Sequence, residues 1–228
     1  MKKSLIILFL LSKWVLFSQT EPQKKIESDS LYREDQFYFT ITNNSLQNGP
    51  KNFKQNRFSL GLATGFLRDM PINKKRNFSI AAGFGYSIII LNQNIKITEA
   101  ESEKTYSVVE NSNYDKNKLS LHYIDFPLEI RWRTSNATDS QFWRIYSGFK
   151  FSYMVYNQYK FESTNDIISL QNIPEVNKVQ YGVYLSAGWD TFNIYLYYGL
   201  NPIFKSAFVG NEAIKTNTFN FGLQFYIL

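Results

Sequence analysis

Six charged residues in the second half of the chain have the spacing of an ionic cluster. Within each of two neighbouring segments, these residues are separated by an even number of positions. They are Asp125, Glu129, Arg131, Arg133, Arg144 and Lys150. Residues two apart on an extended strand project to the same side, so each set would occupy one face. Charges that leave water must be paired. The cluster therefore predicts an ionic network that holds neighbouring strands in register, with a contact site for a protein partner as the alternative.

The single histidine gives little support to catalysis. His122 stands three residues before Asp125, which places the two side chains on opposite faces of a regular strand. A catalytic triad is defined by geometry, not by the presence of its residue types. The sequence also contains no cysteine, no glycine-rich phosphate loop and no metal-ligand spacing. We therefore expect a protein that is not an enzyme, with no catalytic residue, cofactor or metal.

The charged residues lie in the fourth and fifth of eight segments that alternate large apolar residues with polar or small ones. These segments cover residues 36–43, 57–68, 77–91, 118–133, 141–156, 178–189, 192–200 and 216–228. Most reach the roughly 9–11 residues with which a tilted strand crosses a bilayer. In the last segment Phe219, Phe221 and Leu223 oppose Asn220 and Gly222. Lipid on one side and a polar lumen on the other would explain both faces.

The connections between these segments alternate strictly in length. Short links cover residues 69–76, 134–140 and 190–191, and long links cover 44–56, 92–117, 157–177 and 201–215. A soluble β-sandwich, the alternative fold, has no reason to sort its loops in this way. The pattern predicts an eight-stranded antiparallel up-and-down transmembrane β-barrel with short periplasmic turns and long, solvated extracellular loops. Eight strands leave a lumen that side chains fill, which argues against a pore.

The fourth segment breaks the alternation. Leu119, Leu121 and Tyr123 share one face, whereas the apolar residues from Ile124 to Trp132 share the other. A β-bulge near Tyr123–Ile124 would bring both sets to the same side. We therefore expect a bulge in this strand.

The amino terminus resembles an export signal. Met1-Lys2-Lys3 precedes a short apolar run from Leu5 to Leu11, too short for a spanning helix, and we interpret residues 1–18 as a signal peptide. Residues 19–34 would form a flexible periplasmic segment and residues 35–228 the barrel. The chain carries a formal charge of +6, and loss of three signal-peptide lysines would leave +3. That charge gives no support to nucleic-acid binding.

The 16 tyrosines and 20 phenylalanines suit aromatic girdles at both membrane interfaces. The last ten residues also resemble the C-terminal strand with which outer-membrane barrels address their insertion machinery. We therefore expect the mature chain to be a multi-pass protein of the bacterial outer membrane, in contact with lipid.

Three stretches together resemble the PorT family of Bacteroidetes outer-membrane proteins, called SprT in gliding species. They are Arg68-Asp69-Met70-Pro71-Ile72-Asn73 with Arg76-Asn77, residues 126–135 (FPLEIRWRTS) and residues 142–146 (FWRIY). The likeness extends over the mature chain from residues 35–39 (DQFYF). It implies a barrel associated with the type IX secretion system, which exports folded cargo and supports gliding motility in some species.

Two of these motifs lie at the short-turn end of the expected barrel, so we hypothesise a partner-contact site at two of the short turns. Its residues are Arg68, Asp69, Met70, Pro71, Ile72, Asn73, Thr134 and Ser135. Other secretion components would be the partners, although proline and asparagine are also ordinary turn formers. A competing hypothesis is an OmpA-like structural or adhesive barrel that acts through its extracellular loops.

Overall fold

The structure is a computed structural model and describes residues 34–55, 57–101, 103–110, 113–134 and 142–227. The expected signal peptide, all but one residue of the 19–34 segment, and Ser135 lie outside the described residues. Among the described residues, no helix has the length and apolar character that crossing a membrane requires.

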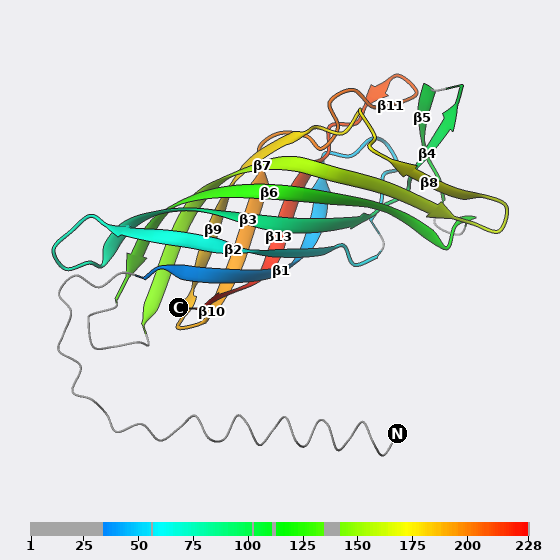
Figure 1. Cartoon of the computed structure of the whole chain (residues 1–228). Coiled ribbons are helices and arrows are strands. Elements are labelled where there is room, and N and C mark those ends of the chain that lie inside the picture. The colour runs from blue at the N-terminus through cyan, green and yellow to red at the C-terminus, as the bar shows by residue number, and fades with distance from the viewer. Residues whose placement is uncertain (1–33, 56, 102, 111–112, 135–141, 228) are drawn as a thin grey trace, which may run out of the picture. The chain divides into compact units, whose positions relative to one another are not determined.

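Eight long strands close into an antiparallel barrel (Figure 1). They are β1 (Gln36–Gln47), β2 (Leu60–Pro71), β3 (Phe78–Asn92), β6 (Lys116–Arg133), β7 (Trp143–Glu162), β9 (Val179–Trp189), β10 (Phe192–Gly199) and β13 (Asn217–Ile227). Each strand pairs with the previous and the next of this series, and β13 pairs with β1 from Ile227 opposite Phe37 to Asn217 opposite Gln47. The predicted eight-stranded up-and-down barrel is confirmed.

The short turns lie at one end of the barrel and the long connections at the other (Figure 1). The long connections contain further strands: β4 (Ile95–Ala100), β5 (Glu103–Val108), β8 (Ile167–Gln171), β11 (Phe208–Val209) and β12 (Glu212–Ala213). Strand β8 extends the barrel wall beside β7, and the other four form a small sheet in the order β12-β11-β5-β4. In outer-membrane barrels the short turns face the periplasm, so this sheet belongs to the extracellular end.

The extracellular end has a hydrophobic core of its own. Ile95, Ile97 and Tyr106 from the β4–β5 hairpin are buried together with Phe204 and Ile214 from the last long loop. Removing these side chains from water stabilises the loops at about 25 cal/mol per Å² of apolar surface. The prediction that the long loops are solvated connectors is therefore wrong, because they pack into an ordered cap.

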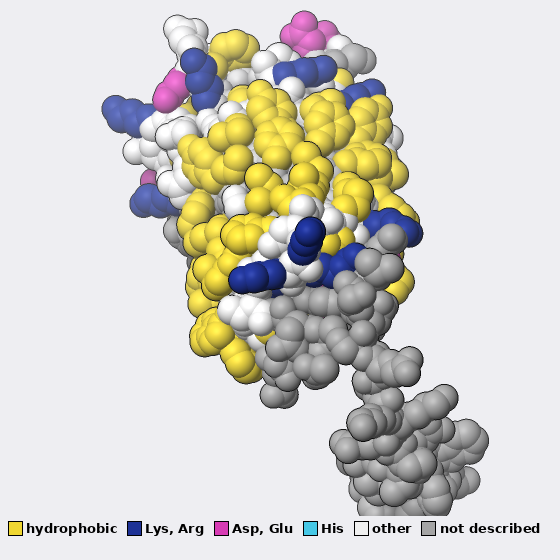
Figure 2. Space-filling view, turned by 90° about the vertical axis from the view of Figure 1, so that its left-hand side faces the viewer, with side chains coloured by type: hydrophobic (Ala, Val, Ile, Leu, Met, Phe, Trp, Pro, Cys, Tyr) yellow, Lys and Arg dark blue, Asp and Glu magenta, His cyan; other side chains and the backbone are white. Residues whose placement is uncertain are grey.

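The outer wall is apolar around the barrel. Figure 2, which faces the short-turn end, shows hydrophobic side chains over the part of this wall that is in view. Exposed aromatic residues border the apolar band at both ends: Phe37, Trp143, Trp189 and Phe192 on the periplasmic side, and Tyr86, Tyr153, Tyr181 and Tyr198 on the extracellular side. Such aromatic girdles are typical of barrels that sit in the outer membrane.

The β-bulge lies in β7 and not in β6. His122 is opposite Tyr156 and Tyr123 is opposite Met154, which leaves Val155 as the extra residue. Strand β6 alternates without interruption, so Leu119 and Leu121 face inward and join the core of the cap. The prediction of a bulge in the fourth segment was wrong because it assigned every apolar residue to the lipid face. The extracellular part of β6 instead lines an apolar interior.

Candidate functional site

A buried ionic network fills the short-turn end of the lumen, and Asp69 lies at its centre. The two carboxylate oxygens of Asp69 accept hydrogen bonds from Arg133 Nη1 at 3.0 Å and Nη2 at 2.9 Å. Arg131 Nη1 donates to the same carboxylate at 3.2 Å, and the Ser79 hydroxyl donates at 2.6 Å. All three charged side chains are shielded from solvent. Asp69 thus joins β2 to β3 and β6 through charged hydrogen bonds, which are stronger than neutral ones.

Glu129 provides the second carboxylate of the network. It accepts from Arg131 Nε at 2.6 Å and from the Tyr184 and Tyr226 hydroxyls at 2.8 Å and 3.3 Å. The Arg131 guanidinium also lies 4.7 Å from the centre of the Tyr146 ring. Cation–π contact and paired charge both offset the cost of burying this arginine.

Arg144 lies in the same interior but lacks a carboxylate partner among the described residues. Its guanidinium lies 4.5 Å from the Phe142 ring centre and 5.4 Å from that of Tyr226. Its Nε and Nη1 atoms are buried without a hydrogen-bond acceptor. Aromatic rings therefore supply the contacts of Arg144.

The Glu34 carboxyl lies just before β1. Burial raises the pKa of this carboxyl, although the charges of Arg133 and Arg144 oppose the shift.

The network extends into the first short turn. Arg133 Nε donates to the Arg76 carbonyl at 3.1 Å. Within the turn, Asn73 Nδ2 donates to Asn77 Oδ1 at 2.6 Å and Asn73 Oδ1 accepts from the Phe78 amide at 3.2 Å. An asparagine that bonds to nearby main chain and side chain fixes the shape of a turn. The buried charges thus position a surface turn.

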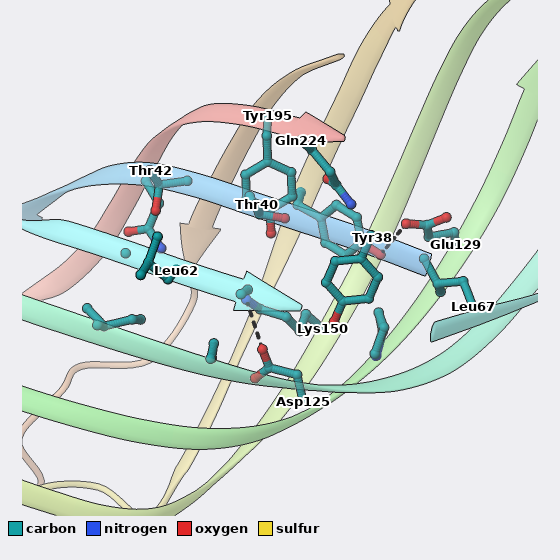
Figure 3. A pocket seen from close by; sticks show the side chains of 17 residues that line it. Tyr38, Thr40, Thr42, Leu62, Leu67, Asp125, Glu129, Lys150, Tyr195 and Gln224 are labelled. Carbon is teal, nitrogen blue, oxygen red and sulfur yellow. Dashed lines mark hydrogen bonds and ion pairs between the residues drawn. The ribbon is translucent and has the colours of Figure 1, made fainter. Parts of the chain in front are cut away.

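A second ion pair lines a small cavity in the middle of the lumen (Figure 3). Lys150 Nζ lies 3.7 Å from Asp125 Oδ2, and the Ser152 hydroxyl donates to Asp125 Oδ1 at 2.5 Å. The cavity volume is about 30 Å³, enough for one or two water molecules. A Cβ added at Gly148 would lie 2.3 Å from the Tyr184 ring. Glycine at this position therefore leaves room for a tyrosine that fills the lumen.

This filled lumen leads to an electrical prediction. We expect the purified barrel in a planar lipid bilayer to give no steady single-channel current, because tyrosines and ion pairs occupy the path. Stepwise conductance comparable to that of a porin under the same salt conditions would contradict the packed interior.

The eight residues proposed for partner contact divide between interior and surface. Arg68, Met70 and Ile72 are exposed on the outer side of β2 and its turn, and Thr134 is also exposed. Asp69 is fully buried, so its carboxylate does not face the periplasm. We missed its place in the network because the predicted second segment ended at residue 68. Continuing the alternation by one residue would have placed Asp69 on the inner face.

His122 lies outside the network. Its Nδ1 is 2.6 Å from the Tyr86 hydroxyl on the outer wall, and its ring packs against Tyr156. Asp125 faces the lumen. Among the described residues, no group of three or more His, Asp or Glu side chains could hold a metal ion.

A family comparison agrees with this architecture. Residues 17–205 match the family model described as outer membrane protein beta-barrel domain. The attachment invasion locus protein Ail of Yersinia pestis is similar in structure, with a TM-score of 0.42 and 11% identity over 86% of this chain and 100% of Ail. A mutant porin of Rh. blastica gives a TM-score of 0.21 and 7% identity over the same shares. No curated protein matches the sequence significantly.

Proposed function

The chain belongs to the family of outer-membrane protein β-barrel domains, and on that premise we propose that it is an accessory of the type IX secretion system. In this role it contributes to the export of secreted and cell-surface proteins, and to gliding where the host glides. It carries no enzymatic activity of its own. Its short-turn end docks periplasmic or membrane components of the secretion apparatus.

The observation that carries this proposal is the convergence of the three PorT-like stretches. Asp69 comes from the first stretch, Arg131 and Arg133 from the second, and Tyr146 from the third. They are far apart in sequence, yet they meet in one buried network at the short-turn end. A set of residues that resembles one family and fixes one end of a barrel supports a role for that end.

The turn that the network positions has the surface of a docking site. Ile72 exposes an apolar side chain in this turn, and Lys74 and Lys75 are exposed beside it. In Figure 2, basic side chains lie on the end that faces the viewer. An apolar centre with a charged rim is the usual composition of a protein interface, and the charges select a partner of opposite sign. The partner surface is therefore expected to be acidic and partly apolar.

The test begins with a clean deletion in the native host. Periplasm and medium are blotted for a cargo that carries the type IX C-terminal signal. We expect cargo to accumulate in the periplasm and to return to the medium when the wild-type gene is supplied. Normal export in the deletion strain would refute the proposal.

The same strain tests the docking turn. Complementation with Ile72→Asp or with Lys74→Glu combined with Lys75→Glu is expected to reduce cargo export at least tenfold, while the amount of folded barrel in the membrane is unchanged. Lys205→Glu is the matched control, because Lys205 is an exposed lysine of the extracellular cap. Equal export by the turn variants and this control would exclude the turn as the docking site.

One observation favours a second candidate function, adhesion or structural support through the cap. Ile167 and Phe208 are large apolar residues at the extracellular end, and they are 85% and 52% exposed. Exposed apolar residues mark a binding site when they form a contiguous patch, so this alternative requires the two residues to share one surface. Ile167→Ser with Phe208→Ser would abolish surface attachment under this alternative and leave cargo export intact. The secretion proposal predicts the same tolerance of export, so the attachment assay distinguishes the two functions.

A further inference from the structure

Two lysines face each other on the outer wall of the barrel, near the extracellular end. Lys118 of β6 is the register partner of Lys160 of β7. Leu119 and Tyr159 are fully buried on the inner side, so the two lysines project outward. Residues directly opposite on antiparallel strands have Cβ atoms about 5 Å apart, and like charges at this distance destabilise the pair.

Neither ammonium group has a counterion in the described part of the chain. No ion pair or side-chain hydrogen bond joins Lys118 or Lys160 to another described residue. The adjacent outward pair on the same two strands is different, because Lys116 Nζ lies 2.6 Å from Glu162 Oε1. The wall therefore offers one neutralised pair and, beside it, two positive charges that repel.

The lysine pair lies beyond the extracellular border of the apolar wall, because Lys118 is six residues from Ile124, the register partner of Tyr86. On β3, Ile88 and Ile90 face outward, and Ile90 is the register partner of Ser120. Lys118 is the next outward residue of β6 beyond Ser120, about 7 Å further along the strand. Lysine stems tolerate contact with an apolar wall, so these ammonium groups can reach back along the strands toward the headgroup region.

We propose that Lys118 and Lys160 bind a phosphate group of the phosphorylated glycolipid that forms the outer leaflet of the bacterial outer membrane. The site is on the lipid-facing wall at the extracellular side, where such phosphates are the abundant anions. Ser169 of β8 is the register partner of Lys160, and its exposed hydroxyl offers a further hydrogen bond. A bound phosphate replaces the repulsion between the lysines with two attractive contacts. This site is independent of the proposed docking turn.

The test measures binding of bisphosphorylated lipid A to the purified full-length barrel in neutral detergent, by native mass spectrometry. Lys118→Gln with Lys160→Gln is expected to weaken binding about tenfold or more, at about 1 kcal/mol for each lysine near an anionic lipid surface. Lipid A without phosphates is expected to bind wild type and variant equally. Lys116→Gln with Glu162→Gln is the control, because it removes the neutralised pair without changing net charge and should retain binding.

A third variant separates folding from binding. Lys160→Glu places a carboxylate opposite Lys118, so the barrel should be at least as stable as wild type toward heat while lipid A binding falls. Unchanged lipid A binding in this variant and in the double lysine variant would overturn the proposal. So would displacement of lipid A by millimolar inorganic phosphate, since the site would then recognise the free anion.

Discussion

Replacing Asp69 with asparagine is expected to destabilise the barrel by about 3–5 kcal/mol, the cost of leaving buried charges without their partner. Asp69 forms ion pairs with both Arg131 and Arg133, and all three side chains have zero exposure. Glu129 would still pair with Arg131 at 2.6 Å. Arg133 would lose its two-pronged contact with the Asp69 carboxylate. The loss should therefore be larger than for a carboxylate in an exposed ion pair.

Unfolding by urea in lipid vesicles, followed by tryptophan fluorescence, measures this effect. Asp166→Asn is the matched control, because Asp166 also forms a short ion pair, 2.6 Å from Lys96, but its side chain is about half exposed. Exposed ion pairs contribute about 0–1 kcal/mol. Equal losses of unfolding free energy in the two variants would show that the network at the short-turn end does not stabilise the barrel.

The Asp69→Asn substitution should also affect the first short turn, which lies on the surface. Arg133 bonds both Asp69 and the carbonyl of Arg76 in the first turn. When Asp69 no longer fixes the guanidinium, this turn loses a support. In the secretion assay, a folded Asp69→Asn barrel should therefore export less cargo than the Asp166→Asn control, even though Asp69 itself contacts no partner.

The sequence predicted the barrel because a membrane imposes one simple rule on every strand. Alternation appears wherever one face meets lipid and the other a polar lumen, as in β13, and closure removes every edge. The alternating loop lengths then fixed the up-and-down order. Strand ends were less predictable. Strand β7 continues to Glu162, six residues beyond its expected end, because β8 pairs with this extension.

The cap could not be predicted by the same rule. Its sheet depends on Val209 of β11 pairing with Tyr106 of β5, two short segments separated by about a hundred residues. No periodicity links such segments, since the contact is made by packing between loops. Isolated apolar residues such as Ile173 and Val176 therefore resembled scattered loop residues, although both are buried in the core of the cap.

The candidate site was predictable in part. Even spacing correctly indicated that Glu129, Arg131 and Arg133 share one face, because strand geometry alone decides it. The partners of these charges depend on which strands are neighbours and at what register. The part that Asp69 and Tyr226 play in the network therefore depends on the positions of β2 and β13, which spacing along the sequence does not give.

The position of the bulge leads to the second large effect, a contrast between two deletions in β7. Deleting Val155 should leave a folded barrel. Tyr156 would then follow Met154 directly, which keeps Tyr156 opposite His122 and leaves Asn157 and the residues beyond it on their present faces. The deletion removes a bulge and one lipid-facing side chain, so the expected cost is modest.

Deleting Ser147 should prevent insertion of a folded barrel. A one-residue shift exchanges the two faces of a strand, so either the residues before position 147 or those between it and the bulge must turn over. The first choice sends Arg144 toward lipid and the second sends Lys150. A charge on the lipid face costs about 2–4 kcal/mol at the middle of the bilayer and less near its surfaces. Exposing Lys150 therefore costs more than exposing Arg144, and the network or the Asp125 ion pair is lost as well.

Folding into vesicles separates these outcomes, because a folded barrel migrates faster than its heated form on a detergent gel. We expect the Val155 deletion to show this heat-dependent shift and the Ser147 deletion to migrate only as the unfolded chain. If both deletions fold equally well, the register of β7 does not determine which of its faces meets lipid. If neither folds, Val155 is required and is not a removable insertion in the strand.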